Sequence, residues 1–190
     1  MKKNRLEAFS DGVLAIIITI MVLEMKIPKG DNFTDLKEVI PTFISYLFSF
    51  VYIGLYWNNH HHLWQAAKKV NGKILWANLH LLFWLSLFPF ATGWIGENHI
   101  TKIPVALYGI ILMMSAFAWY ILEKLILKEE GPDSPAAKAF KKNHKELISI
   151  GVYFIGILLA FLLPIVSVLI YAIVAILWIV PDKRVEKLNT

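Results

Sequence analysis

Residues 5–23 read RLEAFSDGVLAIIITIMVL, and this stretch decides the class of fold. Its second half is almost entirely aliphatic, and the expected span continues through Glu24 and Lys26 to Ile27 before Pro28-Lys29-Gly30-Asp31 ends it. A helix crosses the hydrocarbon layer of a membrane with roughly 20 apolar residues. We therefore expect residues 6–27 to form a transmembrane helix. Acidic residues interrupt the start of the run, and no small-x-small cleavage site follows it, which favours a mature helix over a signal peptide.

The rest of the chain repeats this pattern. Of its 190 residues, 57% are hydrophobic and only 17% are charged, with a mean hydropathy of +0.58. Five further apolar stretches cover residues 39–63, 74–95 with Pro89 inside, 105–127, 147–163 and 165–180. The sequence thus predicts an all-α integral membrane protein in the lipid bilayer, with one domain of six transmembrane helices over residues 1–190.

The basic residues predict the orientation of these helices. If the N-terminus is cytoplasmic, 15 of the 19 Lys and Arg residues fall on the cytoplasmic side, in residues 2–5, 68–73, 124–145 and 183–187. Only Lys26, Lys29, Lys37 and Lys102 fall outside. Basic residues near helix ends stay in the cytoplasm, so both termini are expected there and the helix count is even. The net charge of +5 thus reflects topology, and no nucleic-acid partner is expected.

One face of the first helix is a candidate conduction surface. Residues at spacings of three and four share this face: Phe9, Gly12, Ile16, Thr19, Ile20 and Leu23. Asp11 lies about 140° away from Ile16 around the helix and is expected to face neighbouring helices. Taken alone, the stripe is compatible with facing lipid, a packed helix or a pore. Aliphatic rings can close a pore by dewetting, and a threonine hydroxyl can offer oxygen to a cation.

Enzymatic or metal chemistry has little support in the sequence. Cysteine is absent, and no convergent acid, base or phosphate-binding set stands out, so we expect neither an enzyme nor a cofactor. His60, His61 and His62 are consecutive, so on a helix their side chains point about 100° apart and do not converge on a metal ion. We place them at the cytoplasmic interface, beside Trp57 and Trp64, without assigning them a role.

The motif Arg5-x3-Phe9-Ser10-Asp11-Gly12 resembles the signature that opens the first helix of the endolysosomal potassium channel family, the transmembrane protein 175 family. Weaker similarities extend over nearly all 190 residues. They include Phe50 through Trp57 to His60-His61, Trp76-Ala-Asn78, Leu87-Phe88-Pro89-Phe90, and Pro181-Asp182-Lys-Arg184.

The resemblance implies a six-helix repeat of the bacterial kind, which assembles as a homotetramer around the first helix in the plasma membrane. It implies a channel for monovalent cations, with potassium as the expected ion. On this alignment the aliphatic constriction falls on Ile16, the pore threonine on Thr19, and Ile20 and Leu23 continue the pore-facing side. The motif residues brace the pore helix rather than touch the ion: Arg5, Phe9, Ser10, Asp11 and Gly12.

Two further expectations concern the brace and the selectivity. Asn78 and His80 lie level with the start of the first helix, so a polar cluster of Arg5, Asp11, Asn78 and a histidine is expected. The conventional potassium-channel pore loop, Thr-Val-Gly-Tyr-Gly, is absent, so discrimination must come from side chains at a constriction and should be weaker. Both Thr19 and the aliphatic layers are present, so the strength of potassium over sodium selectivity does not follow from the sequence.

The alternative function is a secondary or proton-coupled transporter of a small solute. Such proteins often carry inverted repeats and broken helices at the membrane centre. No internal repeat is evident within the six stretches, and no charge lies near a stretch centre. The channel interpretation is therefore preferred.

Overall fold

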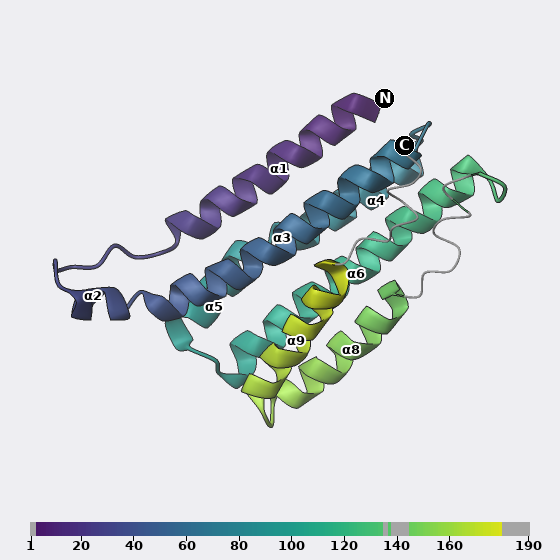
Figure 1. Cartoon of the computed structure of the whole chain (residues 1–190). Coiled ribbons are helices and arrows are strands. Elements are labelled where there is room, and N and C mark those ends of the chain that lie inside the picture. Colours follow the sequence, from purple (N-terminus) through teal and green to yellow (C-terminus); the bar gives the residue numbers. More distant parts are fainter. Residues whose placement is uncertain (1–2, 135–136, 138–144, 180–190) are drawn as a thin grey trace.

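The computed structural model describes residues 3–134, 137 and 145–179, and within this part all regular secondary structure is helical (Figure 1). The helices are α1 (Lys3–Leu23), α2 (Phe33–Lys37), α3 (Ile40–Ala66), α4 (Gly72–Leu85), α5 (Phe88–Asn98), α6 (Lys102–Glu130), α8 (Lys145–Ala160) and α9 (Pro164–Ile179). Four segments are long and apolar enough to cross a membrane: Lys3–Leu23, Ile40–Gln65, Gly72–Asn98 and Lys102–Glu130. The chain is therefore a multi-pass membrane protein.

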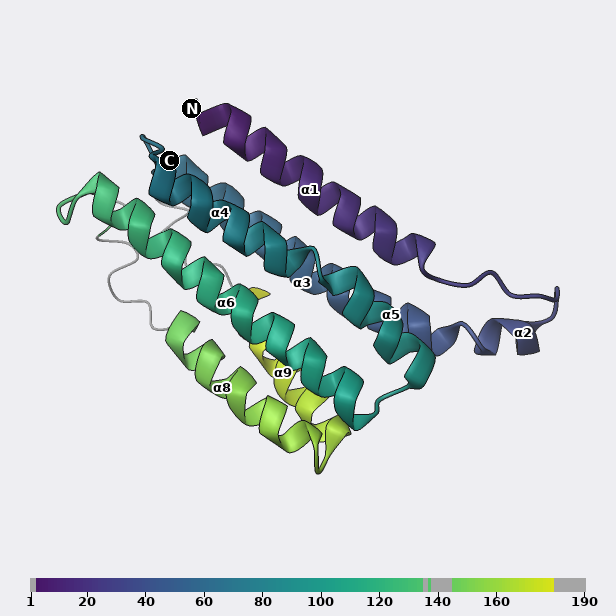
Figure 2. The same cartoon turned by 180° about the vertical axis from the view of Figure 1, so that it is seen from behind.

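The helices form an elongated bundle with α1 along one edge. Figures 1 and 2 show α3 and the α4–α5 pair in the middle, followed by α6, with α8 and α9 on the far side. Accordingly α1 contacts α3, α4 and α5, whereas α8 packs mainly on α6 and α9. The first helix is thus supported from one side of the chain only.

The span expected over residues 74–95, with Pro89 inside it, is present as one apolar span, but it consists of two helices. α4 ends at Leu85 and α5 begins at Phe88, with a turn in which the Leu87 amide donates to the Trp84 carbonyl at 3.2 Å. The cause is Pro89, which has no N–H and whose ring would clash with the carbonyl of Leu85 in an unbroken helix. The two helices still form one apolar span, Gly72–Asn98, with a break near its middle.

The first helix is shorter than expected, since it ends at Leu23 rather than at Ile27. Residues that precede a proline disfavour the helical region, and Pro28 followed by Gly30 gives the chain a turn instead. The segment that leads to α3 includes the short helix α2, which the hydropathy pattern did not predict. Lys26 Nζ pairs with Glu97 Oε1 of α5 at 2.8 Å and holds this segment near the bundle.

A hydroxyl network and small residues hold the interior together. The Ser49 hydroxyl lies 2.6 Å from that of Thr92 and 2.9 Å from that of Tyr108, so it joins α3 to α5 and α6. The ring of Tyr171 from α9 packs against Gly109 and Gly156, where an added Cβ would overlap with it. Helices approach closely in membranes where such small residues lie between them.

Candidate pore helix

α1 uses one face to pack against the rest of the chain. The side chains on this face are buried: Leu6, Ser10, Leu14, Ile17 and Met21. They recur at spacings of three and four residues, so they form one stripe along the helix. The stripe contacts α3, α4 and α5, and it fixes how α1 is rotated about its own axis.

The opposite face of α1 is left uncovered by the chain. The proposed pore residues Ile16, Thr19, Ile20 and Leu23 are all exposed, with Ile16 at 59% and Leu23 at 76%. Gly12 is exposed as well, and a Cβ added there would meet nothing within 4 Å. These residues therefore share one outward surface, which we call the α1 stripe. Phe9 lies at its start, 52% exposed.

The hydroxyl of Thr19 is oriented by its own helix. Its Oγ1 donates to the carbonyl oxygen of Ala15 at 2.9 Å. This bond uses the hydroxyl hydrogen, so the oxygen keeps its lone pairs for an acceptor role on the exposed side. The arrangement is suitable for contact with a cation or water, and that role stays a prediction.

A buried polar chain fixes α1 to α3 and α4. The Ser10 hydroxyl donates to the Leu6 carbonyl at 2.9 Å and accepts from Asn78 Nδ2 at 2.9 Å. Asn78 Oδ1 lies 2.8 Å from His60 Nε2, and Trp64 Nε1 donates to the same nitrogen at 2.8 Å. Ser10, Asn78 and Trp64 are fully buried and His60 is nearly so. We call these four residues the α1 brace.

The two hydrogen bonds to His60 Nε2 require different protonation of that nitrogen. It must carry a hydrogen to donate to Asn78 Oδ1, but it must be free of hydrogen to accept from Trp64 Nε1. One neutral imidazole satisfies only one of these bonds at a time. The tautomer of the His60 ring therefore decides whether Asn78 or Trp64 is its hydrogen-bond partner.

The expected cluster of Arg5, Asp11, Asn78 and a histidine is brought together only in part. Asn78 meets Ser10 and His60, whereas Asp11 lies on the exposed side and accepts from Trp57 Nε1 at 3.1 Å. Arg5 makes no hydrogen bond or ion pair with any residue that the structure describes. His80 takes no part in the brace, because its Nε2 accepts from Trp84 one turn later, at 2.9 Å.

Comparison with known proteins identifies the family. A potassium channel of Chryseobacterium sp. (strain P1-3) is 58% identical over 187 residues, which cover 98% of this chain and 97% of that protein. The chain belongs to the TMEM175 family. The family described as endosomal/lysosomal potassium channel TMEM175 matches residues 5–89. A potassium channel of Streptomyces collinus is 30% identical over 151 residues, or 73% of either chain.

The fold agrees with this membership. The chain is similar to the crystal structure of a lysosomal potassium-selective TMEM175 homologue from Chamaesiphon minutus, with a TM-score of 0.79 and 27% identity. The similarity covers 93% of this chain and 95% of that one. Since the TMEM175 match spans residues 5–89, it includes the whole α1 stripe and all four residues of the α1 brace.

The side chains of the three consecutive histidines in this TMEM175 member point in different directions, as their spacing predicts. His60 is buried in the brace, and His61 Nδ1 lies 3.4 Å from Glu7 Oε1 of α1 on the exposed side. His62 is half-buried. Within the described residues, no three His, Asp or Glu side chains gather as a metal site would require. Two of the three histidines therefore contact α1 or its brace.

Sequence reasoning predicted a histidine beside Asn78 without identifying it as His60, and it missed Trp64 and the partner of Asp11, Trp57. The available signal was a polar or aromatic side chain every third or fourth residue of α3, at positions 57, 60, 61 and 64. Such a pattern predicts one polar face directed at a neighbouring helix. It does not by itself say which helix is the neighbour.

Proposed function

We propose that this TMEM175-family chain forms a potassium-permeable channel in which several copies, four by the family pattern, surround a path lined by the α1 stripe. Its potassium-channel relatives and its fold support channel activity, and the family is one of channels rather than enzymes. The main observation in favour of α1 as the pore helix is that its two faces differ. One face is buried and braced, while the other stays uncovered.

The stripe supplies the parts that such a pore needs. Ile16 and Leu23 would form aliphatic rings, and rings of this kind can close a narrow pore by expelling water. Thr19 and the neighbouring Ile20 would lie between these rings, with the Thr19 oxygen available to a dehydrating cation. The permeant species would be a monovalent cation, and nothing in the proposal requires a bound cofactor.

The proposal includes six membrane crossings with both termini in the cytoplasm. Four spans follow from length and hydropathy, and α8 and α9 would supply the other two as a short hairpin through residues 161–163. Each of these two helices has 16 residues, about 24 Å at 1.5 Å per residue, so they would cross with little tilt. The distribution of Lys and Arg supports this orientation, and the bacterial relatives support the plasma membrane as the location.

Planar-bilayer recordings test the proposal. The purified full chain is recorded under opposed potassium and sodium gradients, with Ile16→Asn as the variant. We expect unitary currents that reverse toward the potassium equilibrium potential, and a larger open probability or conductance in the variant. Absence of unitary currents, together with solute flux that saturates, would favour a transporter instead.

Cysteine substitution tests the lining of the pore separately. The chain has no cysteine, so a single introduced thiol reports one position. A charged thiol reagent should block current through Leu23→Cys, and it should leave Ile155→Cys unaffected. Ile155 is a matched control because it is 54% exposed but belongs to α8 on the far side of the bundle. Equal block at both positions would count against a path lined by α1.

A further inference from the structure

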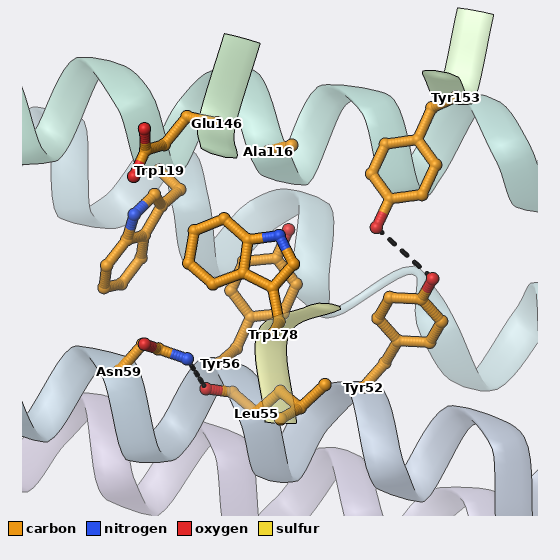
Figure 3. Close-up of a pocket in the computed structure, with 9 residues that line it drawn as sticks. All are labelled: Tyr52, Leu55, Tyr56, Asn59, Ala116, Trp119, Glu146, Tyr153 and Trp178. Atoms are coloured by element: carbon orange, nitrogen blue, oxygen red, sulfur yellow. Dashed lines mark hydrogen bonds between the residues drawn. The ribbon is translucent and has the colours of Figure 1, made fainter. Parts of the chain in front are cut away.

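A second polar site lies away from α1, beside a cavity between α3, α6, α8 and α9 (Figure 3). The cavity measures about 30 Å³, which is room for about one or two water molecules. Aromatic rings form most of its wall, among them Tyr56, Trp119 and Trp178, and Glu146 contributes a carboxyl group at one end. The cavity has no part in the α1 stripe.

Glu123 of α6 lies close to Glu146 and is a buried carboxyl group without a hydrogen-bond partner. It is 1% exposed, and neither Oε1 nor Oε2 accepts a hydrogen bond from a described residue. Lys124 Nζ lies 3.9 Å from Oε1, and the lysine side chain is 49% exposed. Burying a carboxylate without hydrogen bonds in a membrane protein is costly, so this one requires an explanation.

Glu146 of α8 is the second buried acid, 2% exposed, and its charge acts on the Glu123 carboxyl group across the contact between α8 and α6. The indole Nε1 of Trp119 is also buried and has no acceptor among the described residues. Figure 3 shows this nitrogen and the Glu146 carboxyl group pointing toward one another. Three polar groups from α6 and α8 thus lie near one another, and two of them, the Glu123 carboxyl group and the Trp119 N–H, have no hydrogen-bond partner among the described residues.

A single added proton would allow the Glu123 and Glu146 carboxyl groups to form a hydrogen bond. Two ionised carboxylates are acceptors only, so they repel one another and form no hydrogen bond. When one of them is protonated it becomes a donor, and a charge-assisted O–H···O⁻ bond joins the pair. The remaining single negative charge is then offset by the Lys124 ammonium and the Trp119 N–H.

We propose that Glu123 and Glu146 bind one proton between them and that this shared proton joins α6 to α8. The site is distinct from the conduction path and would make the packing of the α8–α9 hairpin depend on pH. A bound monovalent cation would neutralise the same pair by a different route, and the experiment below separates the two.

Other titratable groups on helices packed against α6 do not replace this proton. Lys73 and His80 lie on α4, and the His80 ring already accepts from Trp84. Glu97 of α5 pairs with Lys26, and Lys145 precedes Glu146 on α8. Tyr153 of α8 and Tyr171 of α9 are tyrosines, and tyrosines and lysines ordinarily keep their protons near neutral pH. The two carboxyl groups are therefore the proposed site of the change.

Infrared spectroscopy of the full chain in lipid nanodiscs tests the site directly, because a protonated carboxyl group has a carbonyl band that a carboxylate lacks. We expect the wild type to retain this band at neutral pH. E123Q and E146Q should each lower the pH at which it disappears by at least about one unit, as for coupled acids. Asp133→Asn, an exposed acid, is the control that should leave the band unchanged.

Two infrared results would overturn the proposal. The first is a wild type without the band at neutral pH, particularly if added potassium shifts the carboxylate bands in a saturable way. The second is a band whose pH dependence is the same in E146Q as in the wild type, which would assign the proton to Glu123 alone.

Thermal unfolding in the same nanodiscs supplies a second readout. The folded pair would hold its proton more tightly than the unfolded chain does. Its stabilisation is then present at low pH and is lost as the pH rises through the titration of the pair. The wild-type midpoint should fall over this range, whereas the E123Q/E146Q double variant, whose amides do not titrate, should not follow it. Parallel curves for the two proteins would refute the shared proton.

Discussion

Replacing Ser10 by alanine tests whether the α1 brace holds the proposed pore helix in place. Ser10 is fully buried and accepts the Asn78 Nδ2 hydrogen bond at 2.9 Å, so Ser10→Ala leaves a buried amide donor without an acceptor. An unsatisfied buried donor costs about 1–3 kcal/mol, and interhelical hydrogen bonds in membranes are worth about 0.6–2 kcal/mol. We therefore expect a loss of about 1–2 kcal/mol in the free energy of unfolding.

The assay is thermal unfolding of the detergent-solubilised full chain, monitored by size-exclusion chromatography after heating. For a chain of this size, 1 kcal/mol corresponds to about 2–4 °C in Tm, so Ser10→Ala should lower Tm by about 2–8 °C. Ser86→Ala is the matched control, because its exposed hydroxyl bonds only to its own helix, with Phe83 O at 2.7 Å. A shift in Ser10→Ala no larger than in Ser86→Ala would refute the reasoning.

Three further predictions address the close packing at Gly156, the hydrogen bond to the exposed Asp11 of α1, and the ion pair between Lys26 and Glu97. Gly156→Ala should destabilise by about 1–3 kcal/mol, because its new Cβ would lie 2.5 Å from Tyr171 Cε1. Gly151→Ala on the same helix meets nothing within 4 Å, so its Tm should not fall; equal losses would count against close packing at Gly156. Trp57→Phe removes the hydrogen bond to Asp11 and should change single-channel open probability more than Trp76→Phe does, since the exposed Trp76 indole has no described partner. Hydrogen bonding and charge from Glu97 raise the pKa of Lys26 above the ordinary lysine value of 10.5, so the lysine keeps its charge and the pair should persist at every pH below that value. The Tm difference between wild type and Glu97→Gln should then stay constant from about pH 6 to pH 9, and a difference that varies over this range would contradict it.

The sequence was sufficient to predict which residues of α1 share one face, because that prediction needs only the 100° step between helical residues. Phe9, Gly12, Ile16 and Leu23 follow from the step alone, but their exposure does not, since a packed helix, lipid or a pore could all face them. The partner of Asp11 required more, since it depends on how α1 and α3 are rotated and aligned. Those two quantities come from tertiary packing, which is why Trp57 was not predicted and the histidine expected beside Asn78 was not identified as His60.

The form of the distortion at Pro89 and the buried acids were not predicted, for different reasons. Pro89 signalled a distortion, but a kink and a break between two helices have the same local sequence. Nothing in the sequence singled out Glu123, which lies near the end of an apolar stretch. Its burial arises only because α8 returns along α6 and places Glu146 against it.

Apolar exposure does not by itself distinguish a pore-facing helix from a lipid-facing one, because isoleucine and leucine are stable in either place. The discriminating residues on the α1 stripe are Gly12 and Thr19, since small and hydroxyl-bearing side chains are favoured where helices approach one another or meet water. The brace strengthens the distinction, because it fixes the rotation of α1 with buried hydrogen bonds that a helix free to turn in lipid would not need. A helix held at one rotation, with glycine and threonine on its uncovered side, thus supports the proposal of a neighbouring copy and an aqueous path on this side of α1.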